Sequence, residues 1–425
     1  MNVSKLKKSI NKLRTFFHVY RQWQQLTHKL MDSHTEYPHL IIIPCDPWSV
    51  GGSRGDEAML TAVIQQYRSH YPGIPIEIIA EGDLGMNYIE KLNLEGVTPR
   101  RFWENAYPLE RIYTNCMALN PSHVVVLGAD CMDGFYAPNL SLMLLALHDL
   151  FSRSSGVESR LMGFSFNAHP SRLMTWAFKH ASSETVFNLR DAISLERFNR
   201  TTNIKAGLVA DSAFMLRPDY DFAGYRELEQ WIATRRAHGT IHIIGMNFHP
   251  MLRKYDGADD IKKDALVLAR NVEQILKSNP NLDFVFIPHD DRSRLTDNLM
   301  LGTMAEYIKQ KGLGSRVFYK EDVYRAPQLK AICRLLDGLV SSRMHLAIAA
   351  LGQGKSVLAA SYQGKFEGLY QHFSLPQQFI LPAHVFISDG MINTFQKYIA
   401  HLNELTKLVE ENLPLVTKLS KRNLA

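Results

Sequence analysis

Cysteine is scarce in the sequence and gives no sign of a metal site or a disulfide framework. The 425 residues include four cysteines, without a Cys-x-x-Cys pair and without the Cys/His spacing of a zinc site. Three of them lie in or beside apolar stretches, which is typical of small buried residues in a reducing compartment. The four are Cys45, Cys116, Cys131 and Cys333. This pattern argues against a disulfide-stapled secreted fold and favours a cytoplasmic location.

Long apolar runs and concentrated positive charge are missing as well. No apolar window approaches the roughly eighteen residues that a membrane span needs, and the N-terminus lacks the apolar core of a secretion signal. The net charge of +6 is mild, and much of the excess lies at the two ends of the chain. Because no basic stripe is interleaved with aromatic residues, we do not expect nucleic acid as a partner. The charge balance favours anionic ligands or an acidic membrane surface.

The first 33 residues or so have the pattern of one basic helix. Apolar residues from Leu6 to Leu26 recur near the helical period, with lysines and arginines between them. Basic amphipathic helices of this kind lie on anionic membranes, although more of them pack on their own domain or on a partner. The sequence therefore leaves peripheral membrane contact through this helix as one of two interpretations.

Apolar runs that end in polar residues recur along the rest of the chain and predict an α/β fold. With hydrophobic residues at 46% and charged residues at 21%, the chain can bury sizeable cores, and its length suits two domains. The repetition of strand, polar edge and helix is the βαβ rhythm. The expected strands cover residues 40–44, 76–80, 124–127, 159–163 and 185–188, and then residues 241–245, 284–288, 316–318, 336–340 and 356–359. The predicted organisation is a basic helix (1–36), two α/β domains (37–220 and 221–382) and a C-terminal helical segment (383–425).

A glycine-rich loop follows the first expected strand. It contains Gly51, Gly52 and Gly55, and glycine allows the backbone to approach a ligand closely. The spacing fits neither the dinucleotide fingerprint nor a Walker A loop. Asp56 and Glu57 suit the first turn of the helix that follows, which is also their purely structural explanation. The loop should lie at the carboxyl edge of the sheet, where ligands of α/β domains bind.

An arginine and a histidine stand at the start of an alanine-rich helix in the second half of the chain. Ser341 and Ser342 end the apolar run 336–340, and Arg343 and His345 follow. A helix N-terminus exposes unpaired N–H groups and carries partial positive charge, so these residues predict an anion site. Arg190 likewise follows an expected strand directly. In isolation, Arg343 and His345 are also explained by simple solvation, and the segment that follows Arg190 needs only a helix cap by Asp191.

The ordered set of motifs resembles the polysaccharide pyruvyl transferase family. The resemblance rests on five segments: residues 55–60 (GDEAML), 188–191 (NLRD) with Ser194, 210–214 (ADSAF), 343–345 (RMH), and Ser361-Tyr362 with Lys365. It implies a GT-B-like fold, in which two Rossmann-like domains face each other across a cleft, with the acceptor side in the N-terminal domain and the donor side in the C-terminal domain. It also implies transfer of pyruvate from phosphoenolpyruvate to a glycan or lipid-linked sugar, closing a pyruvate ketal.

The resemblance assigns roles to individual residues. Arg190 and Arg343 would bind phosphoenolpyruvate, because a guanidinium grips an oxyanion with two hydrogen bonds. His345 would be the general acid, since histidine exchanges protons near neutral pH. Asp56 would act on the acceptor hydroxyl or hold the glycine loop. Ser342 and Lys365 complete the donor site, and the acceptor-side candidates are Gly55, Glu57 and Asp130. We expect no cofactor and no metal, because arginines can neutralise the donor's charge.

Two other functions remain open at this point. In a GT-B glycosyltransferase that uses a nucleotide sugar, Arg343, Lys365 and the helix terminus would hold a diphosphate instead. A catalytically silent sugar-binding protein would keep the fold without the reaction.

Overall fold

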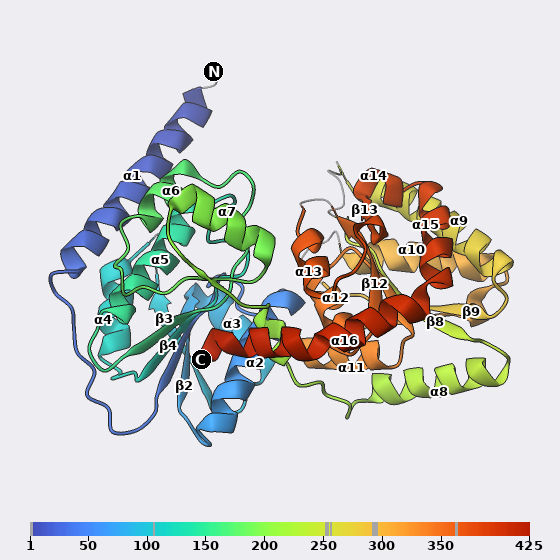
Figure 1. The fold of residues 1–425 in the computed structure, drawn as a ribbon, viewed down its shortest axis with the longest axis horizontal. Coiled ribbons are helices and arrows are strands. Elements are labelled where there is room, and N and C mark those ends of the chain that lie inside the picture. Colours follow the sequence, from blue (N-terminus) through green and yellow to red (C-terminus); the bar gives the residue numbers. More distant parts are fainter. Residues whose placement is uncertain (1–2, 105–106, 251–254, 256, 291–295, 362–363) are drawn as a thin grey trace. The chain divides into compact units, whose positions relative to one another are not determined.

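The computed structural model describes residues 3–104, 107–250, 255, 257–290, 296–361 and 364–425 (Figure 1). The chain divides into two compact units. Unit 1 consists of Met1–Gly52, Met59–Met215 and Lys418–Ala425. Unit 2 consists of Ser53–Ala58 and Leu216–Thr417. Each unit is built on its own parallel sheet covered by helices, so the predicted α/β class is confirmed.

The sheet of unit 1 has five parallel strands in the order β3-β2-β1-β4-β5. The strands are β1 Leu40–Ile43, β2 Ile76–Glu81, β3 Val97–Trp103, β4 His123–Val126 and β5 Glu158–Leu161. A two-stranded sheet, β6 Asn188–Leu189 with β7 Gly207–Leu208, follows, and then the 3-10 helix η1 Ser212–Met215. β1 and β4 are buried along their whole length, as parallel strands covered on both faces are. The strand β3 was not predicted, because it is a half-buried edge strand whose residues are mixed in polarity.

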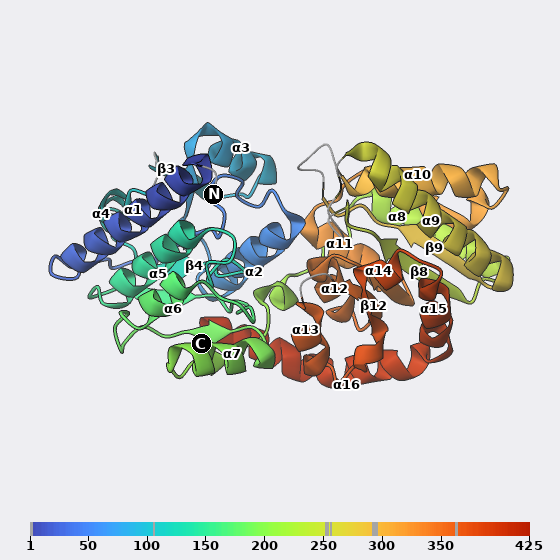
Figure 2. The ribbon, with the colours of Figure 1, turned by 90° about the horizontal axis from the view of Figure 1, so that it is seen from above.

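The helices of unit 1 include a layer made by α1, α4 and α5, which lie side by side (Figure 2). The bounds are α1 Val3–Leu26, α2 Arg54–His70, α3 Gly82–Leu92, α4 Leu109–Met117, α5 Pro138–Ser152, α6 Arg172–Phe178 and α7 Ala192–Thr202. Phe16, Val19 and Trp23 of α1 are fully buried, and the Trp23 indole donates to the buried Asp149 carboxylate of α5 at 2.9 Å. The second half of α1 is therefore part of the core of unit 1.

The predicted N-terminal helix ends earlier than expected, at Leu26 rather than near residue 33. The chain beyond it forms hydrogen bonds outside the helix. Met31 N donates to the Tyr113 hydroxyl at 2.9 Å, and Ser33 N donates to Ser155 O at 2.9 Å. These bonds satisfy main-chain donors that a longer helix would have used internally.

Unit 2 contains a six-stranded parallel sheet in the order β10-β9-β8-β11-β12-β13. The strands are β8 His242–Asn247, β9 Leu282–Phe286, β10 Val317–Tyr319, β11 Gly338–Ser341, β12 Ser356–Ser361 and β13 Ile380–Pro382. The α-helices are α8 Ala223–Ala237, α9 Ala258–Ser278, α10 Asp297–Gln310, α11 Ala326–Arg334, α12 Met344–Leu351, α13 Phe366–His372, α14 Ala383–Phe386, α15 Gly390–Ala400 and α16 Leu402–Lys421. The 3-10 helices of unit 2 are η3 Gly314–Arg316 and η4 Gln377–Phe379, and η5 Arg422–Leu424 lies in the C-terminal residues that belong to unit 1.

In both sheets, the direction in which successive strands are added along the sheet reverses at one point. In unit 1 this point lies between β1 and β4, and in unit 2 it lies between β8 and β11. In open α/β sheets, ligands bind outside the carboxyl ends of the strands at such a point. The segments that follow β1, β4, β8 and β11, including the first turns of α2 and α12, are therefore the places where function is expected. They carry Gly55, Asp56, Glu57, Asp130, Ser342, Arg343 and His345.

The last eight residues belong to unit 1 and are bonded into it. Ser420 donates its hydroxyl proton to Asp211 O at 2.7 Å, and the Asn423 amide donates to Ala210 O at 2.8 Å. Asn423 also accepts from Gly163 N at 2.7 Å. In the described part of the chain, no helix is long and apolar enough to cross a membrane.

Candidate active site

The turn between β11 and α12 is held by the two serines that were predicted to belong to an anion site. Ser341 Oγ accepts from Arg343 N and donates to Arg343 O, both at 3.0 Å. Ser342 is buried, and its hydroxyl oxygen accepts from His249 N at 2.6 Å. Ser342 thus ties the segment after β8 to the segment after β11. Its proposed contact with a donor remains a prediction.

The Arg343 side chain is fixed by two carboxylates. Its Nη2 donates to Asp297 Oδ1 at 2.6 Å, and its Nη1 donates to Asp290 Oδ2 at 3.1 Å. The guanidinium is largely buried, and among the described residues its Nε has no hydrogen-bond partner. One N–H donor of this rigidly held arginine is therefore left without an acceptor in the described part of the chain.

Asp297, at the start of α10, is the centre of this arrangement. Its carboxylate is fully buried, and Oδ2 accepts from Asn247 Nδ2 at 2.9 Å and from His289 N at 3.0 Å. Burial raises the pKa of Asp297, while Arg343 and Asn247 act in the opposite direction. Asp297 was not among the predicted candidates, because it lies 46 positions before Arg343 and no local pattern marks it.

His345 lies directly against Gly55, a residue 290 positions earlier in the chain. A Cβ atom built on Gly55 would be 2.3 Å from His345 Nδ1, far inside van der Waals contact. Only glycine allows the α2 backbone to approach the imidazole so closely. Both residues belong to unit 2, so the structure brings together two candidates that the sequence placed in different motifs.

Glu57 forms ion pairs at the start of α2. Its side chain is fully buried and pairs with Arg54 Nη1 at 3.2 Å and with Arg325 Nε at 3.1 Å. A carboxylate held by two arginines in this way ties the start of α2 to the start of α11. Contact with an acceptor remains a prediction, whereas the structural role is visible. Asp56, the neighbouring candidate, is half-buried, and its N–H donates to Ser53 Oγ at 3.3 Å.

A second histidine, His289, follows β9 and lies near Arg343. His289 is buried, and in the described part of the chain its Nδ1 has no hydrogen-bond partner. Burial lowers the pKa of His289 well below its usual value, and the charges of Arg343 and Arg54 act in the same direction. His289 is therefore neutral near pH 7.

Arg190 belongs to unit 1 and follows β6 directly, as predicted. It is buried, and its Nη1 pairs with Asp211 Oδ2 at 2.9 Å while its Nε donates to Ser165 Oγ at 2.6 Å. The next residue, Asp191, caps α7 by accepting from Ser194 N at 2.7 Å, which confirms the predicted cap. The motifs around Arg190 and Asp211 are thus joined by an ion pair.

Two further candidates lie in other places. Asp130 is half-buried in the loop after β4 of unit 1, next to Ala129, whose φ of 47° is in the left-handed region. Lys365 is half-buried and precedes α13 in unit 2. Tyr362, which formed part of the Lys365 motif, lies outside the described residues. No group of three or more His, Cys, Asp or Glu side chains within the described ranges is arranged to hold a metal ion.

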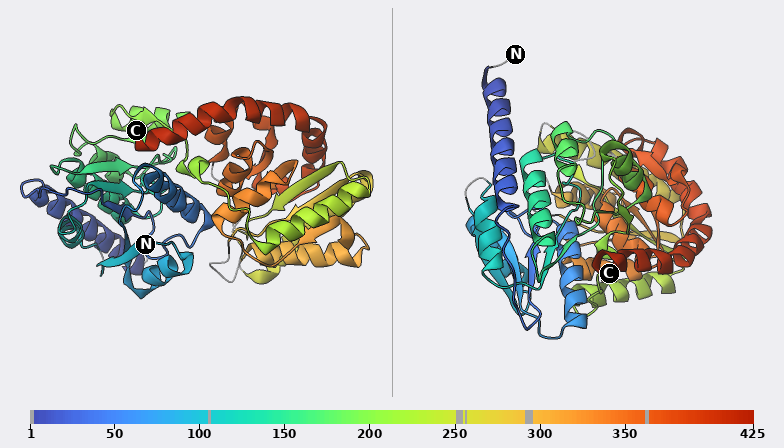
Figure 3. Two further views of the ribbon diagram at one scale, coloured as in Figure 1. Left: turned by 90° about the horizontal axis from the view of Figure 1, so that it is seen from below. Right: turned by 60° about the vertical axis from the view of Figure 1, so that its left-hand side comes forward.

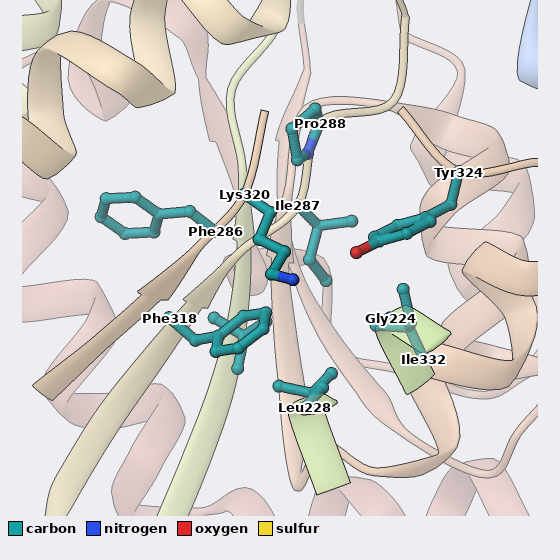
Figure 4. Close-up of a pocket in the computed structure, with 10 residues that line it drawn as sticks. Gly224, Leu228, Phe286, Ile287, Pro288, Phe318, Lys320, Tyr324 and Ile332 are labelled. Carbon is teal, nitrogen blue, oxygen red and sulfur yellow. The ribbon is translucent and has the colours of Figure 1, made fainter. Parts of the chain in front are cut away.

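A small pocket in unit 2 does not contain the candidate residues (Figure 4). Its wall is mainly apolar and includes Leu228, Phe318 and Ile332, with Lys320 and Tyr324 as polar members. Lys320 forms an ion pair with Glu227. Apolar walls of this kind do not suit a doubly charged anion, so we do not assign the pocket to the site.

Comparison with solved structures defines the class of fold. A protein described as a UDP-N-acetylglucosamine 2-epimerase from Listeria monocytogenes matches 92% of this chain and 96% of its own, with a TM-score of 0.57 and 12% identity. The UDP-GlcNAc 2-epimerase from Neisseria meningitidis bound to UDP-GlcNAc matches 91% and 98%, with a TM-score of 0.54 and 13% identity. The UDP-forming α,α-trehalose-phosphate synthase from Burkholderia vietnamiensis matches 92% and 98%, with a TM-score of 0.50 and 11% identity. The chain has a GT-B-like fold with Rossmann-like domains.

The family is defined by the sequence. The family model for polysaccharide pyruvyl transferase matches residues 54–364, which is well over half of the chain. The chain therefore belongs to the polysaccharide pyruvyl transferase family, as the motifs predicted. A search of curated proteins gives no match. The matched region begins at Arg54 and includes Gly55, Arg190, Arg343 and His345.

Replacing Asp297 with alanine should destabilise the protein. The change leaves the Arg343 guanidinium, the Asn247 amide and the His289 N–H without their shared acceptor. Removing one partner of a buried ion pair costs about 3 kcal/mol. We expect urea denaturation, followed by circular dichroism, to show a loss of this size in the free energy of unfolding.

The matched control is Asp221→Ala, which removes an acid that is almost fully exposed and pairs with Arg226. Surface pairs of this kind contribute less than about 1 kcal/mol. Equal denaturation curves for Asp297→Ala and Asp221→Ala would contradict the central role of Asp297.

Proposed function

We propose that this protein transfers pyruvate from phosphoenolpyruvate to a sugar acceptor and closes a pyruvate ketal. The observation that carries the proposal is the rigid Arg343 at the start of α12, with His345 two residues further on, in a chain of the polysaccharide pyruvyl transferase family. The GT-B-like fold, shared with enzymes of sugar nucleotides, supports a sugar as the other substrate.

The donor is an anion with a carboxylate and a phosphate, so the proposed reaction requires cations for both. Arg343 is already oriented by Asp290 and Asp297, so it loses little side-chain entropy when it binds an oxyanion. Arg190, oriented by Asp211, is the second proposed arginine. Lys365 and Ser342 would add a point charge and a hydroxyl. These assignments use neither a cofactor nor a metal.

The reaction moves two protons. Two acceptor hydroxyls each lose a proton when the ketal closes, the methylene carbon of phosphoenolpyruvate gains one, and the departing phosphate takes the other. In this scheme His345 protonates the methylene carbon, and the hydroxyl oxygens then form two bonds to the neighbouring carbon as the bond to phosphate breaks. Asp56 is the proposed base for an acceptor hydroxyl. Proton transfer by a positioned side chain typically contributes a factor of about a hundred or more.

We also propose a cytoplasmic enzyme that contacts a membrane through α1, where a lipid-linked acceptor would be met. Ile10, Leu13 and Phe17 lie on one side of α1 and are 42%, 43% and 43% exposed. Phe17 and Tyr20 contact the Trp176 ring at 6.1 and 4.6 Å, which extends the apolar surface onto α6. Figure 3 shows the N-terminal end of α1 projecting from the rest of unit 1.

The charged residues beside this surface suit an anionic bilayer. Arg14 and Arg21 of α1 are exposed near the apolar stripe, and Lys179 is exposed next to α6. Aromatic rings and basic side chains around an apolar stripe are the usual composition of helices that lie in the interface of a membrane.

Isotope-labelled donors test the reaction. Incubation with carbon-labelled phosphoenolpyruvate and a cell-derived glycan should give a labelled, acid-labile, carboxylate-bearing product and release inorganic phosphate. Transfer of label from a nucleotide sugar with release of the nucleotide, together with no transfer of label from phosphoenolpyruvate, would instead establish a glycosyltransferase. Absence of transfer from either donor would support the alternative of a catalytically silent sugar-binding protein.

Replacing His345 with alanine should lower kcat by about a hundredfold or more, the scale of a lost general acid. Affinity for phosphoenolpyruvate, measured by calorimetry, should stay largely intact, because Arg343 is untouched. Unchanged turnover in a folded His345→Ala protein would rule out the assignment.

The position of His345 can be tested separately through Gly55. A methyl group in Gly55→Ala would displace the imidazole, so turnover should fall by about tenfold or more although His345 is still present. Gly257→Ala is the control, because a Cβ atom there meets nothing within 4 Å. Equal turnover in the two glycine variants would argue against a requirement for this packing.

Membrane contact predicts that the full-length protein floats with vesicles that contain phosphatidylglycerol and not with neutral phosphatidylcholine vesicles. Leu13→Glu combined with Phe17→Glu should abolish flotation, because the apolar stripe would then carry negative charge. Val186→Glu changes an exposed apolar residue elsewhere in unit 1 and should have no effect. Equal flotation of both variants would refute the role of α1.

A further inference from the structure

Two adjacent aromatic side chains are exposed in the loop that joins β4 to α5 in unit 1. Phe135 is 56% exposed and Tyr136 is 49% exposed. Their ring centroids are 5.1 Å apart and the rings are nearly perpendicular, at 87°. Exposed large apolar groups that lie next to each other form a patch, and such patches on soluble proteins commonly mark binding sites.

Hydrogen bonds to Asp133 hold the loop that carries these rings in place. The buried Asp133 carboxylate accepts from Phe135 N at 2.9 Å and from Asn167 N at 2.9 Å, and Asp133 O accepts from Ser171 N at 2.9 Å. Gly134 has a φ of 73°, and a Cβ atom on it would be 2.9 Å from the Ser171 side chain. The rings are thus exposed on a closely fitted backbone rather than on a loosely attached loop.

The position of the loop in the sheet is the one where ligands bind. β4 is the neighbour of β1 on the side where the strand order reverses, and the loop begins at the carboxyl end of β4. Asp130, half-buried, belongs to the same loop. The loop therefore combines two aromatic rings with a carboxylate at the switch point of unit 1.

A pyranose ring matches this combination of groups. One face of a pyranose carries C–H groups, which pack against the electron-rich face of an aromatic ring, and its edge carries hydroxyls that donate to a carboxylate. We propose that Phe135 and Tyr136 form an aromatic platform for the acceptor sugar, with Asp130 as an acceptor for its hydroxyl protons. The identity of the ligand as the acceptor rests on the proposed function, and its identity as a sugar rests on the family.

The test measures sugar binding first, without the reaction. Saturation-transfer NMR on the full-length protein, with a panel of methyl hexopyranosides, should give signals that are lost in the double variant Phe135→Ala, Tyr136→Ala. The matched control is the double variant Leu84→Ala, Val186→Ala, which removes two exposed apolar side chains of the same unit, 58% and 61% exposed. The control should keep the signals.

Kinetics then connects the platform to the reaction. With carbon-labelled phosphoenolpyruvate, the Phe135→Ala, Tyr136→Ala protein should show a KM for the acceptor raised by about tenfold or more. The KM for phosphoenolpyruvate should stay within about twofold, and Phe135→Tyr should keep most of the acceptor affinity.

The outcomes separate the platform from the proposed function. Sugar signals that depend on Phe135 and Tyr136, in a protein without pyruvyl transfer, would support the platform and refute the reaction. Transfer with unchanged sugar signals in the double variant would refute the platform and keep the reaction. Absence of sugar signals in the unaltered protein, or a double variant that changes only self-association in analytical ultracentrifugation, would also refute the platform.

Discussion

The candidate site of unit 2 depends on one buried carboxylate. Asp297 accepts from an arginine side chain, an asparagine side chain and a backbone N–H that come from three different strand ends. Because a buried carboxylate must satisfy its oxygens, these three segments can adopt few other arrangements relative to one another. The orientation of Arg343 and the position of His289 are consequences of this requirement, and so is the start of α12, on which His345 lies.

Much of the fold could be predicted because buried parallel strands appear in the sequence as unbroken apolar runs. β1 and the apolar part of β4 are of this type, and both were found. β8 and β11 were found as well, although glycine and polar residues interrupt their apolar runs. The edge strand β3 and the three-residue strand β13 were missed, since neither has such a run. Parallel pairing and strand order follow from contacts between distant segments, so no local pattern shows them.

The candidate site was predictable where it is local in sequence. Arg343 and His345 stand two residues apart at a helix start, and Arg190 follows a strand directly, so motif reading located all three. The partners that orient them were not predictable. Asp211, Asp297 and Gly55 reach their partners through the tertiary fold, and a glycine selected for closeness to an imidazole looks in the sequence like any glycine in a turn.

The return of the C-terminus to unit 1 has a consequence for how the protein can be divided. Residues 418–425 supply hydrogen bonds to the carbonyls of Ala210 and Asp211, immediately before the carboxylate that orients Arg190. A fragment that stops at Met215 would contain every strand of unit 1 and still lack these donors. Unit 1 is therefore not contained in one continuous segment of the chain, and removal of residues 418–425 would remove hydrogen bonds next to the carboxylate that orients Arg190.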